Sequence, residues 1–253
     1  MKMTRKEFLQ LLALSAAGAG AGGLGLAAAE QQQPAPAKAG SVRCGMVIDF
    51  RKCRWDSGCE SCLNACRTAH NIPNIPDEAH AVRWVWKEHY ENIFPFEQSD
   101  FTREQYEKHP LDVLCNHCAQ PACVRVCPTA ATWKREDGVV MMDWHRCIGC
   151  RYCMAACPYG SRSFNWSDPR PYIQNPTASF PTRMKGVVEK CNFCEERLAQ
   201  GNPPACCAAC PEKALTFGNL NDEHSAVRQL LRERYALQRK PELGTSPSIF
   251  YLV

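Results

Sequence analysis

Beyond its first thirty residues, this chain of 253 residues has no hydrophobic run approaching the ~20 residues that a membrane-spanning helix needs. It also lacks an excess of charge of one sign, since 30 Lys and Arg residues stand against 26 Asp and Glu residues. A formal net charge of +4 is too balanced to suggest nucleic-acid binding. Hydrophobic residues make up 45% and charged residues 22%, which is typical of a globular chain with one large domain or two small ones.

Two further absences narrow the function. No Cys-x-x-Cys-His occurs, which excludes covalently attached haem. In Cys115-Asn116-His117-Cys118 the histidine lies inside the pair, so we expect His117 near a metal site or on the surface rather than as a ligand. No catalytic constellation stands out either. The chain has eighteen cysteines instead, whereas a disulfide scaffold rich in cysteine is normally far shorter.

Residues 1–29 resemble a twin-arginine export signal. Thr4-Arg5-Lys6-Glu7-Phe8-Leu9 precedes an apolar run that ends at Ala27-Ala28-Ala29, a small-residue cleavage pattern. Lys6 stands where such signals usually have their second arginine. The alternative is a membrane anchor, but residues 11–26 contain five glycines and are short and weakly hydrophobic for a span. We therefore expect export by the twin-arginine route to the periplasmic face of the cytoplasmic membrane.

The cysteines fall into four groups of four, and proline follows the last cysteine of groups two, three and four. The groups are Cys53, Cys59, Cys62 and Cys66 (group one); Cys115, Cys118, Cys123 and Cys127 (group two); Cys147, Cys150, Cys153 and Cys157 (group three); and Cys191, Cys194, Cys206 and Cys210 (group four).

Group three has the spacing C-x2-C-x2-C-x3-C-P of bacterial ferredoxins. Three thiolates spaced so closely can surround one [4Fe–4S] cluster, while the fourth ligates the other cluster of a pair. Zinc sites use paired C-x2-C units and no such run of four with a trailing proline. Disulfides are the second alternative, but cysteines two or three residues apart rarely meet the geometry of a strain-free bridge. The spacing predicts four [4Fe–4S] clusters held by the sixteen grouped cysteines.

An internal repeat supports ferredoxin-like modules. Residues 47–53 match residues 141–147, because each has a short apolar strand, an Asp, an aromatic residue and two polar residues before a first ligand. Asp137-Gly138 between apolar stretches predicts a hairpin, and residues 214–217 offer another strand. The predicted fold is α+β, with two bacterial-type 2[4Fe–4S] ferredoxin-like modules, an aromatic-rich insertion and an extended C-terminal tail.

Proximity in sequence pairs group two with group three, and groups one and four remain for each other. Because the fourth cysteine of each group ligates the partner cluster, this pairing predicts four ligand sets. They are Cys53, Cys59, Cys62 with Cys210; Cys191, Cys194, Cys206 with Cys66; Cys115, Cys118, Cys123 with Cys157; and Cys147, Cys150, Cys153 with Cys127.

Two groups depart from the simple spacing. Group one has five residues between its first two ligands, which we interpret as a three-residue insertion before Gly58, the counterpart of Gly149. In group four, Cys207 adjoins Cys206, and the spacing to Cys210 favours Cys206 as the third ligand. Cys44 and Cys207 are then spare thiols, with a short disulfide or a substitute ligand as alternatives.

The predicted domains follow these groups. After the signal (1–29) and a flexible N-terminus (30–42), module one comprises residues 43–66 and 185–218 and module two residues 111–184. The insertion, 67–110, contains an alternating Val82, Trp84 and Trp86 that predict a strand, and Thr102 to Gln105 that predict a helix start. It either covers the clusters or forms a docking surface. In the C-terminal part, 219–253, Asn221-Asp222-Glu223 predict the start of a helix, and the apolar end must pack on this domain or on a partner.

These groups resemble the four-cluster ferredoxin-like B subunits of membrane-bound respiratory complexes of the dimethyl-sulfoxide-reductase type. The resemblance covers residues 44–218, and it implies electron transfer without a catalytic site. A closer resemblance is to the DsrO family, the periplasmic iron–sulfur subunits of Dsr-type membrane complexes. It is carried by residues 84–88, 114–118, 157–166, 185–191 and 240–245.

The closer resemblance implies a polytopic quinone-interacting membrane subunit, a periplasmic multihaem cytochrome c and cytoplasm-facing haem b and iron–sulfur subunits as partners. The chain would relay electrons between the cytochrome and the quinone-site subunit in dissimilatory sulfur metabolism. The alternative is a B subunit of a molybdenum oxidoreductase of polysulfide, tetrathionate or nitrite-reducing type, which differs only in its partner. An enzyme with an open iron is a third possibility, but sixteen ligands for four clusters leave no vacancy.

Overall fold

The computed structural model describes residues 41–55, 57–96 and 99–253. The predicted export signal (1–29) and most of the predicted flexible N-terminus (30–42) lie outside the described residues. Within those residues, no helix has the length and apolarity that crossing a membrane would require.

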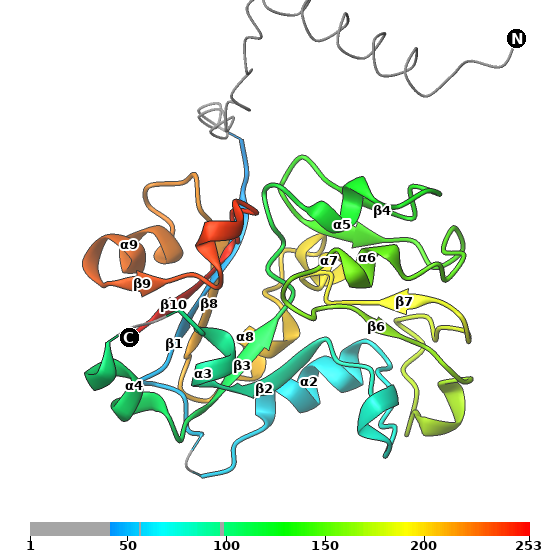
Figure 1. The fold of residues 1–253 in the computed structure, drawn as a ribbon, viewed down its shortest axis with the longest axis horizontal. Coiled ribbons are helices and arrows are strands. Elements are labelled where there is room, and N and C mark those ends of the chain that lie inside the picture. The colour runs from blue at the N-terminus through cyan, green and yellow to red at the C-terminus, as the bar shows by residue number, and fades with distance from the viewer. Residues whose placement is uncertain (1–40, 56, 97–98) are drawn as a thin grey trace, which may run out of the picture. The chain divides into compact units, whose positions relative to one another are not determined.

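A mixed four-stranded sheet joins the first and last described segments (Figure 1). Its order is β8 (Leu215–Asn219), β1 (Cys44–Asp49), β10 (Ile249–Leu252) and β9 (Ala236–Leu237). β1 pairs antiparallel with β8 and parallel with β10, with Ile48 opposite Leu215 on one side and Tyr251 on the other. All six residues of β1 are buried. The apolar C-terminal residues therefore pack inside this domain, as the second strand partner of β1.

Helix α9 (Ala226–Glu233) packs on β8 and β1 and buries Val227 completely. Its N-cap is Ser225, whose side chain accepts a hydrogen bond from the Arg228 backbone N–H. The prediction that the helix starts at residues 221–223 was wrong, because the Asn221 side chain instead donates to the Ser41 carbonyl. Asn221 and Ser225 are both common N-cap residues, and Ser225, which directly precedes the first helical turn, forms the cap.

Residues 61–114 bring an aromatic cluster onto the sheet. They form α2 (Ser61–Ala69), the short 3-10 helix η1 (Glu78–His80), β2 (Val85–His89), α3 (Tyr90–Ile93), α4 (Asp100–Tyr106) and β3 (Pro110–Leu114). β2 pairs antiparallel with β3. Phe50, just after β1, contacts the rings of Tyr90, Phe94, Tyr106 and Tyr251, and the last two centroids lie 5.5 Å away. Part of this segment thus completes the core, while Phe96 and Phe101 remain exposed.

Two details of this segment differ from the predictions. The strand predicted from Val82 to Trp86 begins only at Val85. Helix α4 begins at Asp100 rather than near Thr102, because the Ser99 side chain accepts a hydrogen bond from the Thr102 backbone N–H. Thr102 is therefore in the first turn of the helix, and the earlier hydroxyl caps it.

The remaining elements are short and surround the cysteine groups. The predicted hairpin is confirmed as β4 (Thr132–Lys134) paired with β5 (Val140–Met142), and Gly138 in its turn has φ +84°. β6 (Ser163–Phe164) pairs with β7 (Val188–Glu189). The short helices are α5 (Ala122–Arg125), α6 (Tyr152–Ala155), η2 (Arg170–Tyr172), α7 (Glu195–Leu198), α8 (Ala205–Ala209) and η3 (Pro241–Leu243).

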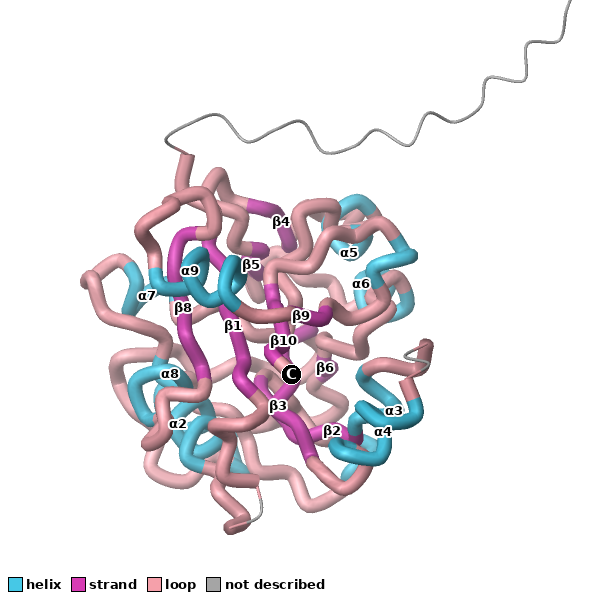
Figure 2. The backbone as a smooth tube through the Cα atoms, turned by 90° about the vertical axis from the view of Figure 1, so that its left-hand side faces the viewer, coloured by secondary structure: helices cyan, strands magenta, loops and turns pink. Residues whose placement is uncertain are grey.

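The cysteine-bearing helices pack in two pairs. α2 packs against α8, and α5 packs against α6. Figures 1 and 2 both show the first pair apart from the second. Groups one and four thus meet through one helix pair, and groups two and three meet through the other.

Candidate iron–sulfur centres

All eighteen cysteines lie within the described residues, and none of them forms a disulfide bond. They gather where the segments of the four groups meet. We number the four predicted ligand sets in the order in which the structure places them: site I (Cys53, Cys59, Cys62, Cys210), site II (Cys66, Cys191, Cys194, Cys206), site III (Cys115, Cys118, Cys123, Cys157) and site IV (Cys127, Cys147, Cys150, Cys153).

Site I is a small cavity lined by all four of its predicted cysteines. Asp112, at 2% exposure, also lines it, with Oδ2 3.2 Å from Cys62 Sγ. Lys87 Nζ lies 3.7 Å from the other carboxyl oxygen. Arg54 of the enlarged loop of group one also lines the cavity, and the neighbouring Trp55 ring stacks on His109 at 3.7 Å between centroids. The inserted residues therefore extend the loop without removing a cysteine from the cavity.

The four cysteines of site II are all buried. Cys66 lies at the C-terminal part of α2 and interacts electrostatically with Cys191, Cys194 and Cys206, the predicted partners from group four. Backbone N–H groups point at the sulfurs, since Phe193 N lies 3.4 Å from Cys191 Sγ and Ala205 N lies 3.3 Å from Cys194 Sγ. Such donors favour the thiolate form that iron requires.

Site III also assembles as predicted. Cys118 interacts electrostatically with Cys115, Cys123 and Cys157, although Cys157 comes from the other group of the pair. In site IV, Cys127, Cys147 and Cys153 belong to one small apolar cluster, and Cys150 is exposed. The structure thus brings the cysteines of sites I to III together, and three of the four in site IV. Their role as iron ligands remains a prediction.

The sites follow one another in a row. Cys62 of site I interacts with Cys206 of site II, and Cys191 of site II interacts with Cys115 of site III. Cys123 of site III interacts in turn with Cys153 of site IV. Site II is enclosed, whereas Cys53 and Cys59 at one end are partly exposed and Cys150 at the other end is exposed. Four clusters in these positions would connect two surfaces of the chain.

Burial raises the pKa of several of these thiols. Burial, followed by the charge of Asp112, raises the pKa of Cys53 to about 11, and burial raises the pKa of Cys118 and Cys194 to about 12. Burial and then Cys115 raise the pKa of Cys191 well above its ordinary value. Iron reverses this balance, because its positive charge stabilises the thiolates and binding releases the protons. The donor set, four sulfurs converging at each of three sites, fits a [4Fe–4S] cluster.

The loop of group three depends on Gly149, which has φ +69°. A Cβ atom at this position would clash with the Gly186 carbonyl oxygen. We expect Gly149→Ala to displace the loop and lower the iron content from about sixteen towards about twelve per chain, because site IV is lost. Iron and acid-labile sulfide analysis after anaerobic purification measures this.

Gly160 is the matched control, since it has φ +64° but no atom within 4 Å of the place that a Cβ would occupy. Gly160→Ala would cost only the ~1–2 kcal/mol of left-handed strain and keep its iron. Equal iron contents in the two variants would contradict the close approach of Gly149 to Gly186.

The two spare thiols differ in their surroundings. Cys44 is buried in β1, and burial, followed by Asp137, raises its pKa to about 11. Cys207 is partly exposed and lies in α8 beside Cys206. Neither forms a disulfide. The alternative of a short disulfide for these two cysteines was therefore wrong.

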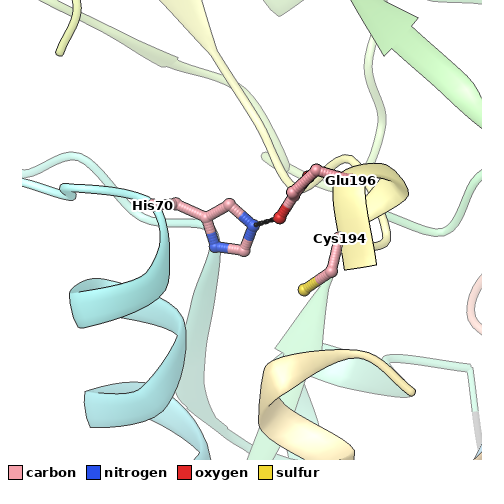
Figure 3. Close-up of side chains that lie close together, drawn as sticks. All are labelled: His70, Cys194 and Glu196. Carbon is pink, nitrogen blue, oxygen red and sulfur yellow. Dashed lines mark hydrogen bonds and ion pairs between the residues drawn. The ribbon is translucent and has the colours of Figure 1, made fainter. Parts of the chain in front are cut away.

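Sequence reasoning missed His70, which lies beside site II. Its Nε2 atom is 2.8 Å from Glu196 Oε1, and its Nδ1 atom is 3.7 Å from Cys66 Sγ. Figure 3 shows His70 and Glu196 joined, with Cys194 next to them, and the ligand atoms of all three lie within 4.8 Å of one another. Cys194 already belongs to site II. The one local sequence signal for His70 was its position four residues after Cys66, about one helical turn along the chain.

His117 is buried, not on the surface. Its ring stacks on Phe193 at 3.7 Å between centroids, and Nδ1 accepts a hydrogen bond from the Val140 backbone N–H. Burial, and then the charges of Lys190 and Arg162, lower its pKa well below the usual range. His117 is therefore neutral and fills the space between group two and group four.

Known proteins resemble this chain over most of its length. The 4Fe-4S dicluster domain family matches residues 109–170 and 176–220. The chain is 36% identical to the Hdr-like menaquinol oxidoreductase iron-sulfur subunit 1 of Archaeoglobus fulgidus, over 98% of this chain and 97% of the relative. It is 37% identical to the menaquinone reductase iron-sulfur cluster-binding subunit of Nitratidesulfovibrio vulgaris, over 85% and 90%. It is 36% identical to the B component of the polysulfide reductase of Wolinella succinogenes, over 81% and 92%.

The matched dicluster segments and the eighteen cysteines fit four [4Fe–4S] clusters. Two of these relatives are named as iron–sulfur subunits, one of a menaquinol oxidoreductase and one of a menaquinone reductase. The chain therefore belongs to the family of iron–sulfur electron-transfer subunits of oxidoreductase complexes.

Proposed function

We propose that this chain relays electrons along sites I to IV between a quinone-interacting membrane subunit and a second redox subunit of the same complex. The observation that carries the proposal is the row of sites, in which site II is enclosed and the two end sites have exposed or partly exposed cysteines. Electron relays need closely spaced cofactors that the protein positions and insulates, with access at each end.

The end at site IV has features of a contact surface. Ile148 and Tyr152, on either side of Cys150, are 66% and 64% exposed. Apolar side chains this exposed are typical of surfaces that a partner covers. We therefore infer that the surface around Cys150 is where one of the two redox partners binds.

The relatives support a quinone-linked complex. Two of them are named for menaquinol or menaquinone, and a third is the B component of a polysulfide reductase. We therefore favour a B subunit of a molybdenum-oxidoreductase-type complex, the expectation ranked second from the sequence. The DsrO resemblance, with a multihaem cytochrome c and a link to sulfite metabolism, has no support in the names of these relatives.

The location is a proposal from the sequence alone. Residues 1–29 support export by the twin-arginine route, with the folded chain held at the periplasmic face of the membrane by a polytopic subunit. Insertion of clusters before export would protect the thiols from oxidation in the periplasm.

The test is anaerobic purification of the membrane complex through an affinity tag at Val253, followed by reduction with a menaquinol analogue. We expect the quinol to reduce clusters of this subunit, observed by low-temperature EPR. Molybdenum without haem c in the complex would support the molybdenum-type assembly, whereas haem c without molybdenum would return the assignment to the Dsr-type complex. Clusters that no quinol reduces, in a complex with full iron, would overturn the relay from quinone.

A further inference from the structure

One buried cation contacts the row of sites directly. Arg162 is 5% exposed, and its Nη2 atom donates to Cys123 Sγ at 3.1 Å and to Thr132 Oγ1 at 2.9 Å. Its guanidinium also interacts electrostatically with Cys115 of site III and Cys153 of site IV. Arg162 therefore lies between these two sites, with its shortest sulfur contact to site III.

No carboxylate forms an ion pair with Arg162 in the part of the chain that the structure describes. A guanidinium keeps its charge in proteins, so this charge is opposed only by the sulfurs around it. Lys190, at 1% exposure, adds a second basic group, with Nζ 2.6 Å from the Cys191 carbonyl oxygen between sites II and III. Two basic side chains thus lie near site III, since both interact electrostatically with Cys115.

The internal repeat provides a comparison within the chain. Arg162 is the fifth residue after the last cysteine of group three, and the same position holds Asn71 after group one, Thr132 after group two and Leu215 after group four. In three of the groups this position immediately precedes or begins a short strand: β6, β4 and β8. Only group three has a cation there. At site I the buried side chain that contacts a cysteine sulfur is the carboxyl group of Asp112, 3.2 Å from Cys62 Sγ.

We propose that Arg162 makes site III the cluster of highest reduction potential in the row, so that it accepts the first electron. The inference rests on the proposed function, because it requires clusters at these sites. Adding an electron makes a cluster more negative, and a nearby positive charge or a hydrogen bond to sulfur stabilises that form. The effect is large where the charged group is buried, as Arg162 is, because water screens its charge less. Electrons entering from either end would therefore collect at site III.

The experiment is an EPR-monitored redox titration of the intact complex, prepared anaerobically, with wild type, Arg162→Gln and Arg162→Lys. The signal of site III is identified as the one missing from a Cys118→Ser variant. We expect site III to be reduced first in wild type. At the potential where wild-type site III is half reduced, Arg162→Gln lowers the ratio of reduced to oxidised cluster at least tenfold, which is ~59 mV for one electron. Arg162→Lys, which keeps the charge, shifts this ratio much less.

Arg170→Gln is the matched control, since Arg170 is an exposed arginine paired with Asp168. It leaves all four titrations unchanged. The inference is overturned if another site is reduced first in wild type, or if Arg162→Gln titrates like wild type with full iron. The order of reduction in wild type can overturn the inference even if Arg162→Gln loses its cluster. Absence of iron from wild type would instead reject the proposed function, so the two failures are distinguishable.

Discussion

Cys206→Ser is expected to remove one cluster, whereas Cys207→Ser leaves all four. The two cysteines are adjacent in α8, yet Cys206 is buried and interacts with both Cys66 and Cys194 of site II, whereas Cys207 is partly exposed. Without its thiolate, site II would keep three cysteines and a weaker hydroxyl ligand. Because site II lies between site I and site III, its loss also interrupts the row.

The measurement is iron and acid-labile sulfide per chain after anaerobic purification. We expect about sixteen of each in wild type and in Cys207→Ser, and about twelve in Cys206→Ser. A site that keeps three cysteines can also retain a three-iron cluster, which would show an EPR signal in the oxidised state and about fifteen irons. The opposite result, with iron lost only from Cys207→Ser, would show that Cys207 is the third ligand of group four.

The same pair of residues shows what could be predicted from the sequence. Ligand spacing is a local property, so the four groups, the exchange of the fourth cysteine and the choice of Cys206 could be argued from the chain alone. Asp137-Gly138 predicted its hairpin for the same reason, because the turn needs φ > 0 at Gly138. Here the residues that specify the structure are neighbours in the sequence.

Contacts between distant residues could not be predicted in this way. The parallel pairing of β10 with β1 joins residues about two hundred positions apart, and nothing local distinguishes a central strand from an extended tail. Likewise, His70 meets Glu196 and Arg162 meets Cys123 only after the modules have packed. The starts of α4 and α9 were predicted wrongly for a different reason. Ser99 and Ser225 are ordinary N-cap residues, but other polar residues nearby were equally plausible N-caps.

Of the substitutions proposed for this chain, Arg183→Met is expected to cause the largest loss of folding stability. Arg183 and Glu189 have fully buried side chains, and Nε lies 2.8 Å from Oε2. The guanidinium also donates to the Asn71 carbonyl at 2.9 Å, and Glu189 accepts from Trp84 Nε1 at 3.1 Å. The pair therefore ties the segment after α2 to β7. Replacing Arg183 alone leaves the buried Glu189 carboxylate without a counter-charge, which destabilises a protein by ~3–5 kcal/mol.

The control is Arg170→Gln, which breaks the exposed pair with Asp168 and is expected to leave the denaturant midpoint close to that of wild type, because water screens exposed ion pairs. Denaturant midpoints, followed anaerobically by circular dichroism and by the visible absorption of the clusters, compare the two. The double variant Arg183→Met/Glu189→Met should regain much of the loss, because removing both charges leaves none unpaired. Should Arg183→Met unfold at the same denaturant concentration as Arg170→Gln, the buried pair would contribute no more than a surface contact. Site II, whose Cys66 lies one helical turn before His70 and Asn71, would then be held by its iron and its helices alone.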